Sequence, residues 1–260
     1  MKYGIIGFGN MGTALCEGLI KKNIKPVVVE KHLPRREIAE KEYNLVVMEA
    51  DEAAKTADII VLAVKPQEVA ALYPLIGKHT EGKGIVSMMA GVSIDAMAKA
   101  LNTKNVIRFM QNLAASVAAS PVAVSCHPDC GEKYSKEALS IAEAIGTPYE
   151  IPEKLMAAFT GLSGSGIAYV FEFINALAMG GVEAGIKYPD SLNIALDTVE
   201  GAVNILRAQK IHPSELVSRV ASPAGTTIEG IRTLEDGAFT AIVMEAVNAA
   251  AQRALELELE

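Results

Sequence analysis

The length, composition and charge of the chain exclude several classes of protein. Its 260 residues suffice for one large or two modest domains, and 50% of them are hydrophobic although only 5% are aromatic. A net charge of −7 argues against a nucleic-acid-binding protein, which usually presents a basic face. Three cysteines are too few for a disulfide scaffold, and the first apolar run directly follows Met1-Lys2, so we expect no signal peptide and a reduced, cytoplasmic setting.

A glycine-rich turn organises the first half of the chain. Residues 3–6 predict a strand, residues 13–22 predict an amphipathic helix, and a G-x-G-x-x-G motif lies between them. In this motif the glycines allow a tight turn, the close approach of a pyrophosphate, and close packing of helix on strand. The helix N-terminus then offers free N–H groups to the phosphates; the alternative is a glycine turn without a ligand. The candidate cofactor-binding residues are Gly7, Phe8, Gly9, Asn10, Met11 and Gly12.

An acidic residue and a basic cluster follow the second predicted strand, residues 26–29. Glu30 stands about 20 residues after the motif, where an acid usually bonds the ribose 2′-hydroxyl of NAD. Lys31, Arg35 and Arg36 could instead hold the 2′-phosphate of NADP, or could be the solvated start of a helix over residues 34–43. Glu30 and Lys31 are therefore candidate cofactor contacts, and the preference between NAD and NADP stays open.

Three more predicted strands, at residues 58–64, 84–89 and 105–110, end in short turns. Ligands of open α/β sheets bind at the carboxyl ends of the strands, so these turns are expected to face the same crevice as the glycine motif. The further candidate cofactor contacts are Ala63, Val64, Lys65, Pro66, Ala90, Gly91 and Asn112. A strand at 119–125 and a helix at 132–145 complete a Rossmann-type dinucleotide-binding domain, which we expect to span residues 1–151.

The stretch Cys126-His127-Pro128-Asp129-Cys130 invites a metal-site interpretation because it holds two thiols and an imidazole. Its spacing is C-x3-C, the chain has no second cysteine pair, and the stretch is a strand-to-helix turn. We therefore assign no metal site.

From about residue 152 the strand patterns stop, and residues 152–260 predict an all-helical domain. The expected helices cover residues 155–161, 167–186, 190–209, 213–220, a stretch from 228, and 238–257. Residues 255–260 alternate leucine and glutamate and are interpreted as a fraying end. The apolar helix at 167–186 approaches the length of a membrane span, but Glu172, Asn175 and Glu183 interrupt it. We interpret it as a buried or dimer-forming helix and expect no membrane contact.

The loop at residues 221–227 is small and hydroxyl-rich, and it precedes a helix. Successive free N–H groups at such a helix start can bind a carboxylate, and a hydroxyl there can bond a polar substrate atom. The alternative is an ordinary helix cap in which Thr226 or Thr227 is the capping residue.

Three motifs together resemble the Δ1-pyrroline-5-carboxylate reductase family. They are Ala63-Val64-Lys65-Pro66, Thr160-Gly161-Leu162-Ser163-Gly164-Ser165-Gly166 and Ser222-Pro223-Ala224-Gly225-Thr226-Thr227, and they occur in order over nearly the whole chain. The resemblance implies a Rossmann domain and an all-α dimerisation domain that interlocks with a second subunit, in a homodimer or a higher homo-oligomer built from dimers. It also implies NAD(P)H-dependent reduction of a small imine acid, 1-pyrroline-5-carboxylate, to L-proline in proline biosynthesis.

The resemblance further implies roles for individual residues. Thr227 matches the threonine whose hydroxyl bonds the ring nitrogen, and it is the candidate catalytic residue. Ser222 and the backbone of Gly225, Thr226 and Thr227 match the loop that binds the carboxylate, and Glu153 matches an acidic residue near the substrate. The glycine motif, residues 63–66 and Ala90-Gly91 match the cofactor contacts.

The chain departs from the family at several positions, and two other functions are considered. Gln111 and Ile167 stand where the family commonly has proline, and Ala224 where it has glycine. A non-catalytic regulatory homologue would keep the fold and the cofactor pocket. A related imine or β-hydroxyacid oxidoreductase is the other alternative; the β-hydroxyacid enzymes place a catalytic lysine where this chain has Val170.

Overall fold

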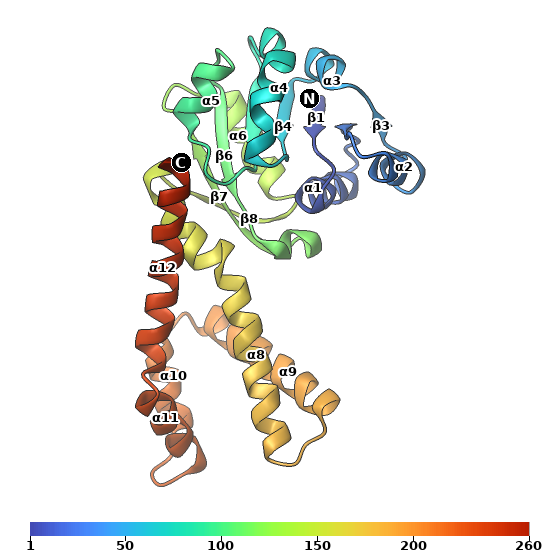
Figure 1. Ribbon diagram of the computed structural model, residues 1–260. Helices are drawn as coiled ribbons and strands as arrows, with labels where there is room; N and C mark the ends of the chain where they lie inside the picture. The colour runs from blue at the N-terminus through green and yellow to red at the C-terminus, as the bar shows by residue number, and fades with distance from the viewer. Residues whose placement is uncertain (260) are drawn as a thin grey trace. The chain divides into compact units, whose positions relative to one another are not determined.

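The computed structural model describes residues 1–259, which form an α/β domain and a set of long helices (Figure 1). One eight-stranded sheet has the order β3-β2-β1-β4-β5-β6-β7-β8. The strands are β1 (Tyr3–Ile6), β2 (Val27–Val29), β3 (Val46–Val47), β4 (Ile59–Leu62), β5 (Gly84–Ser87), β6 (Val106–Met110), β7 (Ser120–Cys126) and β8 (Gly146–Glu150). Strands β1 to β6 run parallel, β7 is antiparallel to β6, and β8 is parallel to β7.

Helices connect the strands and make up the rest of the chain. Those of the α/β part are α1 (Asn10–Lys21), α2 (Leu33–Lys41), α3 (Ala50–Thr56), η1 (Pro66–Glu68), α4 (Val69–Ile76), η2 (Gly77–His79), α5 (Ile94–Ala100), η3 (Leu113–Val117) and α6 (Glu132–Ala142). They are followed by η4 (Glu153–Leu155), α7 (Met156–Phe159), the π-helical turn η5 (Thr160–Gly164), α8 (Gly166–Glu183), α9 (Tyr188–Gln209), α10 (Pro213–Val220), α11 (Thr226–Asp236) and α12 (Phe239–Leu259).

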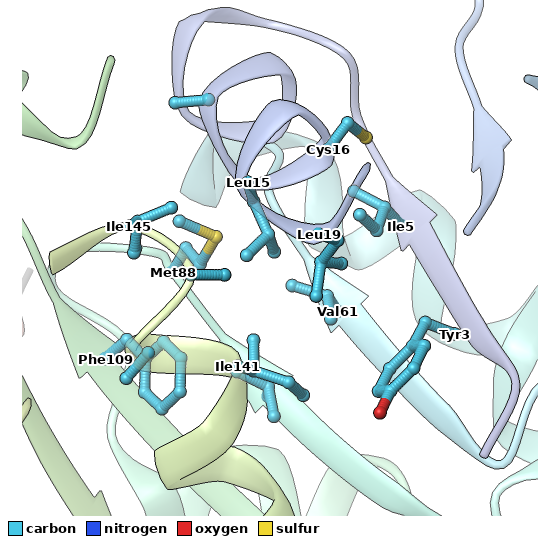
Figure 2. Packing of buried hydrophobic residues seen from close by; sticks show 14 of the residues in the cluster. Tyr3, Ile5, Leu15, Cys16, Leu19, Val61, Met88, Phe109, Ile141 and Ile145 are labelled. Atoms are coloured by element: carbon cyan, nitrogen blue, oxygen red, sulfur yellow. The ribbon is translucent and has the colours of Figure 1, made fainter. Parts of the chain in front are cut away.

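Alternate residues of the central strands supply two hydrophobic cores, one on each face of the sheet. In β1, Ile5 belongs to the cluster that packs against α1 and α6, whereas Ile6 belongs to the cluster with α3, α4 and α5. Figure 2 shows the first cluster, in which Leu15 of α1 and Ile141 of α6 point toward the sheet. Because successive side chains of a strand face opposite sides, a strand covered by helices on both faces is apolar throughout. This explains the unbroken apolar runs in the sequence.

The strand order creates a crevice at the carboxyl ends of β1 and β4. From β1 the chain proceeds outward to β2 and β3, then returns to the other side of β1 for β4 and continues to β5 and β6. The connections therefore leave β1 and β4 in opposite directions, which is the topological switch point where such sheets bind ligands. The predicted fold class, a Rossmann-type domain followed by helices, is confirmed.

Two strands and one α-helix of the α/β part were not predicted, and each has a weak local signal. β3 has two residues, and α3 is a short alanine-rich helix. β8 contains Pro148, which lacks an N–H group; the strand can hold it because β8 lies at the edge of the sheet. Helix α1 also begins three residues earlier than expected, at Asn10, so that Gly12 lies inside it.

The chain divides into two compact units. One unit contains residues 1–165 together with residues 249–260, and the other contains residues 166–248. Residues 152–165 are grouped with the first unit, in which Met156 packs with Met110 of β6 and Ala123 of β7. The expected domain boundary at residue 151 stays a prediction. In the second unit, α8 and α9 pack closely at Gly181, where an added Cβ would lie 2.1 Å from Oγ of Ser191. The neighbouring Gly180 has nothing within 4 Å of such a position.

Apolar side chains cover much of the second unit of the single chain. Those with large exposed fractions include Val170, Phe171, Phe173, Leu177, Met179, Ile194, Leu196, Val203, Ile205, Ile242, Val243 and Met244. The segment Glu153–Glu183 is long and apolar enough to cross a membrane by length and composition, which for one such helix is weak evidence. An apolar surface of this extent more commonly marks a contact with another protein chain.

Candidate functional site

The turn between β1 and α1 depends on its glycines for two different reasons. Gly7 has a φ of +104°, and a Cβ there would lie 2.5 Å from the carbonyl oxygen of Ala63. A Cβ on Gly12 would lie 2.0 Å from the carbonyl oxygen of Gly7. At Gly9, by contrast, the nearest heavy atom to an added Cβ is Nη1 of Arg35 at 3.6 Å. The fold therefore requires Gly7 and Gly12, whereas the missing side chain of Gly9 leaves space for a ligand.

A cavity of about 690 Å³ lies at this turn. Its lining is Ile6, Gly7, Gly9, Asn10, Met11, Val29, Glu30, Lys31, His32, Arg35, Ala63, Val64, Lys65, Glu68 and Met88. These residues lie at the carboxyl ends of β1, β2, β4 and β5 and in the first turns of α1, α2 and η1, so the cavity crosses the switch point of the sheet. Its volume lies within the range of about 300–1,000 Å³ that is usual for small-molecule sites.

The N-terminus of α1 supplies hydrogen-bond donors to this cavity. Gly9 is the residue before the helix and provides no side-chain cap, and the first turn contains no acidic residue. The first intrahelical bond runs from Thr13 N–H to Gly9 O at 2.8 Å, so the amides of the first turn have no partner within the helix. Free amides, the open space at Gly9 and the cavity volume all fit a dinucleotide whose pyrophosphate lies at this helix end.

Glu30 organises the part of the cavity next to β2. Its carboxylate accepts one hydrogen bond from the backbone N–H of Phe8 at 2.9 Å and another from that of His32 at 2.8 Å. The glutamate thus joins the glycine turn to the start of the following loop, while it also lines the cavity together with Lys31 and Arg35. Arg36 instead pairs with Glu49 at 3.1 Å and does not line the cavity.

Six candidate cofactor residues do not line the cavity, namely Phe8, Gly12, Pro66, Ala90, Gly91 and Asn112. Phe8 is buried and packs edge-on against Tyr43. The side chain of Asn112 is already engaged: its Oδ1 accepts from the amide of Ala114 at 2.9 Å, and its Nδ2 donates to the carbonyl oxygen of Ser163 at 3.1 Å. Asn112 therefore ties the end of β6 to the Ser-Gly-Ser-Gly turn. Val29, Glu68 and Met88 also line the cavity, and no motif in the sequence points to them.

Glu153 lies in an ion-pair network around the buried Arg108, which the sequence did not reveal. Its Oε1 accepts from Nη1 of Arg108 at 3.1 Å and from the backbone N–H of Ile94 at 2.7 Å. Arg108 lies in the middle of β6, is 1% exposed, and also pairs with Glu258. The network joins β6, the start of α5, η4 and the end of α12.

The same network corrects the interpretation of the C-terminal residues. We interpreted residues 255–260 as a fraying end, yet α12 remains helical through Leu259. Glu258 in this last turn pairs with Arg108, and the carbonyl oxygen of Leu257 lies 3.2 Å from the position of a Cβ on Gly91. Tertiary contacts therefore hold the last turn of the helix against the α/β unit.

The loop at residues 222–227 forms the second candidate site, within the helical unit. Gly225 precedes α11 and donates its N–H to the carbonyl oxygen of Ser222 at 3.1 Å; a Cβ on Gly225 would lie 2.2 Å from Oγ of Ser222. Thr226 and Thr227 are the first two residues of the helix, and no side chain caps it. The alternative of a threonine cap is therefore wrong, and the first-turn amides have no partner within the helix.

The backbone conformation of Ala224 and the exposure of the two threonines bear on the expected roles of this loop. Ala224 has a φ of +54°, the left-handed region that glycine adopts more readily, so the alanine occupies a position whose geometry suits glycine. Thr227 is half-buried, whereas Thr226 is exposed. Among the described residues, no group of three or more His, Cys, Asp or Glu side chains is placed to hold a metal ion.

Comparison with known proteins identifies the family. Residues 153–257 match the family model described as pyrroline-5-carboxylate reductase dimerisation, and residues 2–91 match the one described as NADP oxidoreductase coenzyme F420-dependent. The pyrroline-5-carboxylate reductase of Aquifex aeolicus is 40% identical to the chain, with 99% of this chain and 97% of the relative covered. The chain belongs to the pyrroline-5-carboxylate reductase family.

Other members of the pyrroline-5-carboxylate reductase family agree over the same length. The pyrroline-5-carboxylate reductase of Methanosarcina acetivorans is 38% identical, with 98% of this chain and 97% of the relative covered. The crystal structure of pyrroline carboxylate reductase from Plasmodium falciparum, with NADP bound, has a TM-score of 0.89 at 29% identity and covers 99% of this chain and 98% of that one. The resemblance stated from the motifs is therefore confirmed, and the family is one of NAD(P)-dependent oxidoreductases.

The match to a dimerisation model explains the apolar surface of the helical unit. The matched residues, 153–257, include all of α8 to α11 and most of α12, the helices that carry the exposed side chains. A match to a dimerisation domain indicates a homo-oligomer, which fits an apolar surface left exposed on the single chain.

Proposed function

We propose that this chain reduces 1-pyrroline-5-carboxylate to L-proline with NAD(P)H, the last step of proline biosynthesis. The observation that carries the proposal is the match of the whole chain, at up to 40% identity, to relatives named pyrroline-5-carboxylate reductase. The two parts of the chain support it separately. One holds a cavity whose volume and free amides suit a dinucleotide, and the other has a helix start without a side-chain cap that suits a carboxylate.

The cofactor, when bound, supplies a hydride from its dihydronicotinamide ring. The residues of the cavity bind and orient it. The free amides at the start of α1 would hold the pyrophosphate, for which Gly9 leaves room. Glu30 and Lys31 would contact the ribose of the adenosine half, and Ala63 and Val64 also line the cavity.

The loop of the helical unit binds the imine acid. The amides of Thr226 and Thr227 donate to the carboxylate, with the Ser222 hydroxyl as a further donor, and the Thr227 hydroxyl bonds the ring nitrogen. The amide of Gly225 already donates to the carbonyl oxygen of Ser222 and shapes the loop. A protonated cyclic imine is already electrophilic, so orientation by two anchors is the main task of the protein; alignment of this kind can lower a barrier by several kcal/mol. Because Glu153 is bonded to Arg108 and Ile94, we assign it to holding this region of the α/β unit in place.

We expect Thr227→Ala to lower kcat/KM for the imine acid about 10- to 100-fold, with little change in cofactor affinity. Loss of one hydrogen bond that orients the substrate costs about 1–3 kcal/mol in the transition state. Thr226→Ala is the matched control, because Thr226 is the exposed neighbour in the same helical turn. Steady-state kinetics of both variants decide the matter. An equal fall of kcat/KM in both variants would assign the effect to the helix start. An unchanged kcat/KM in both would mean that the active site lies elsewhere.

We expect NADH to be used at least as well as NADPH. The carboxylate of Glu30 lines the cavity and would repel a 2′-phosphate, although Lys31 and Arg35 partly offset it. Glu30→Gln removes the charge and keeps an amide oxygen that can accept a backbone N–H, and should shift kcat/KM toward NADPH. Measuring kcat/KM with both cofactors tests this; a strong wild-type preference for NADPH would contradict it.

The working unit is proposed to be a dimer through the helical unit, in a soluble enzyme of the cytoplasm. The exposed apolar side chains of α8, α9 and α12 are too many for a helical unit that stands alone. Light scattering coupled to size-exclusion chromatography should give twice the mass of the chain or a multiple of that. An active monomer at assay concentration would refute the dimer.

A further inference from the structure

Arg35 lies in the first turn of α2, and its side chain reaches the glycine turn before α1. Among the described residues other than the chain neighbours of Gly9, the only heavy atom within 4 Å of a Cβ placed on Gly9 is Nη1 of Arg35, at 3.6 Å. Both residues line the cavity. The guanidinium therefore lies next to the space that the missing side chain of Gly9 leaves for a ligand.

The guanidinium of Arg35 is free to bind a ligand. Within residues 1–259, no carboxylate or carbonyl oxygen pairs with it. The adjacent Arg36 differs, because it pairs with Glu49 at 3.1 Å and does not line the cavity. A free guanidinium offers a planar fork of N–H donors, which matches the oxygens of a phosphate group.

The charge of Arg35 is placed at the unfavourable end of its helix. His32, the residue before α2, provides no side-chain cap, and the first turn of the helix holds no acidic residue. A helix start carries a partial positive charge, so it repels a cation in the free protein. An anion bound at Gly9 would relieve this repulsion, and it would be held by Arg35 as well as by the free amides of α1.

We propose that Arg35 binds the pyrophosphate of the dinucleotide and does not bind the 2′-phosphate that distinguishes NADP from NAD. In a glycine motif of this kind, the second glycine, here Gly9, is the one that the pyrophosphate approaches. The acid after the second strand, here Glu30, is the partner of the ribose 2′-hydroxyl. Because Nη1 of Arg35 lies at Gly9, its charge acts on the part that both cofactors share. Of the bases near Glu30, Lys31 is then the one that remains for the ribose.

This inference rests on the proposed function only in placing a dinucleotide in the cavity. It does not depend on which substrate the dinucleotide reduces. A protein that binds NADH but leaves 1-pyrroline-5-carboxylate unchanged would refute the proposed reaction, and the role of Arg35 would still stand or fall on the binding measurements.

The test is to measure the dissociation constants of NADH, NADPH and ADP-ribose for the wild type, Arg35→Met and Arg36→Met. ADP-ribose carries the pyrophosphate but has neither the nicotinamide nor a 2′-phosphate. Arg35→Met should bind each of these ligands about tenfold more weakly, as expected for the loss of one charge-assisted contact, with the ratio of NADH to NADPH affinity unchanged. Arg36→Met is the matched control and should bind them as the wild type does.

Thermal unfolding of the same variants separates a binding defect from a folding defect. Without ligand, Arg35→Met should unfold at the wild-type temperature or above it, because the substitution removes a cation from a helix start. Added ADP-ribose should raise its Tm less than that of the wild type, because the ligand binds more weakly.

Several results would overturn the proposal. Weakening confined to NADPH would place Arg35 at the 2′-phosphate, and unchanged affinity for every ligand would place it away from the cofactor. Equal weakening in Arg36→Met would indicate a general effect of charge. A wild type that binds neither NADH nor ADP-ribose would refute the cofactor site of the proposed function together with this inference.

Discussion

Replacing Arg108 by methionine is expected to destabilise the α/β unit by about 3–5 kcal/mol, the usual cost of removing one partner of a buried ion pair. The guanidinium is the shared partner of Glu153 and Glu258, and its side chain is 2% exposed. Methionine fills similar space but leaves the carboxylates of Glu153 and Glu258 without their shared cation. Urea unfolding followed by circular dichroism should show a large fall in the midpoint of the transition.

The matched control for this prediction is Arg36→Met. Arg36 pairs with Glu49 at 3.1 Å, but the carboxylate side chain is 76% exposed. Ion pairs of this kind contribute about 0–1 kcal/mol, so the midpoint should move little. The double variant Arg108→Met with Glu258→Gln should recover part of the lost stability, because one unpaired charge is gone. If Arg108→Met and Arg36→Met lowered the free energy of unfolding equally, the network around Arg108 would stabilise the fold no more than an exposed ion pair does.

Gly9→Ala is expected to weaken cofactor binding while the fold stays stable, whereas Gly12→Ala is expected to destabilise the fold. At Gly9 an added Cβ meets only the flexible end of Arg35 at 3.6 Å, so the free protein should unfold at nearly the wild-type temperature. The methyl group would nevertheless occupy space that the pyrophosphate needs. Overpacking of about 1–3 kcal/mol corresponds to cofactor binding about 10- to 100-fold weaker, measurable by fluorescence titration with NADH.

Gly12→Ala should instead damage the fold itself. Its Cβ would lie 2.0 Å from the carbonyl oxygen of Gly7, and backbone atoms cannot yield as a side chain does. We expect a loss of stability of about 3 kcal/mol or more, with cofactor binding lost as a consequence. Gly77→Ala is the control, since its Cβ would have ordinary contact at 3.9 Å with Ala100. A Gly9→Ala variant that binds NADH as the wild type does would refute the assignment of the cavity.

Local patterns predicted those parts of the molecule whose causes are local. The strand, glycine turn and helix around Gly9 follow from neighbouring residues, and the apolar runs of β4 and β5 follow from burial on both faces. Since parallel strands share one edge, the glycine turn, Glu30 and the turn after β4 could be expected at one crevice, and the cavity contains residues from all three.

What could not be predicted depends on contacts between residues far apart in sequence. Arg108 lies in a strand that is otherwise apolar, and neither this position nor the alternating tail indicates that it pairs with Glu258. Asn112 was expected to bind the cofactor from its place at a strand end, yet its side chain bonds Ser163 and Ala114. β8 was missed because Pro148 argues against a strand unless the strand is known to be at an edge.

The central claim is tested most directly by following the hydride itself. The protein is incubated with 1-pyrroline-5-carboxylate and with NADH or NADPH that carries deuterium at C4 of the nicotinamide. The account predicts L-proline with one deuterium, located on the ring carbon that was double-bonded to nitrogen, and a strongly reduced rate for Thr227→Ala. The account would be contradicted if neither NADH nor NADPH gave proline. It would also be contradicted if the proline carried no deuterium, whichever of the two hydrogens at C4 had been replaced by deuterium.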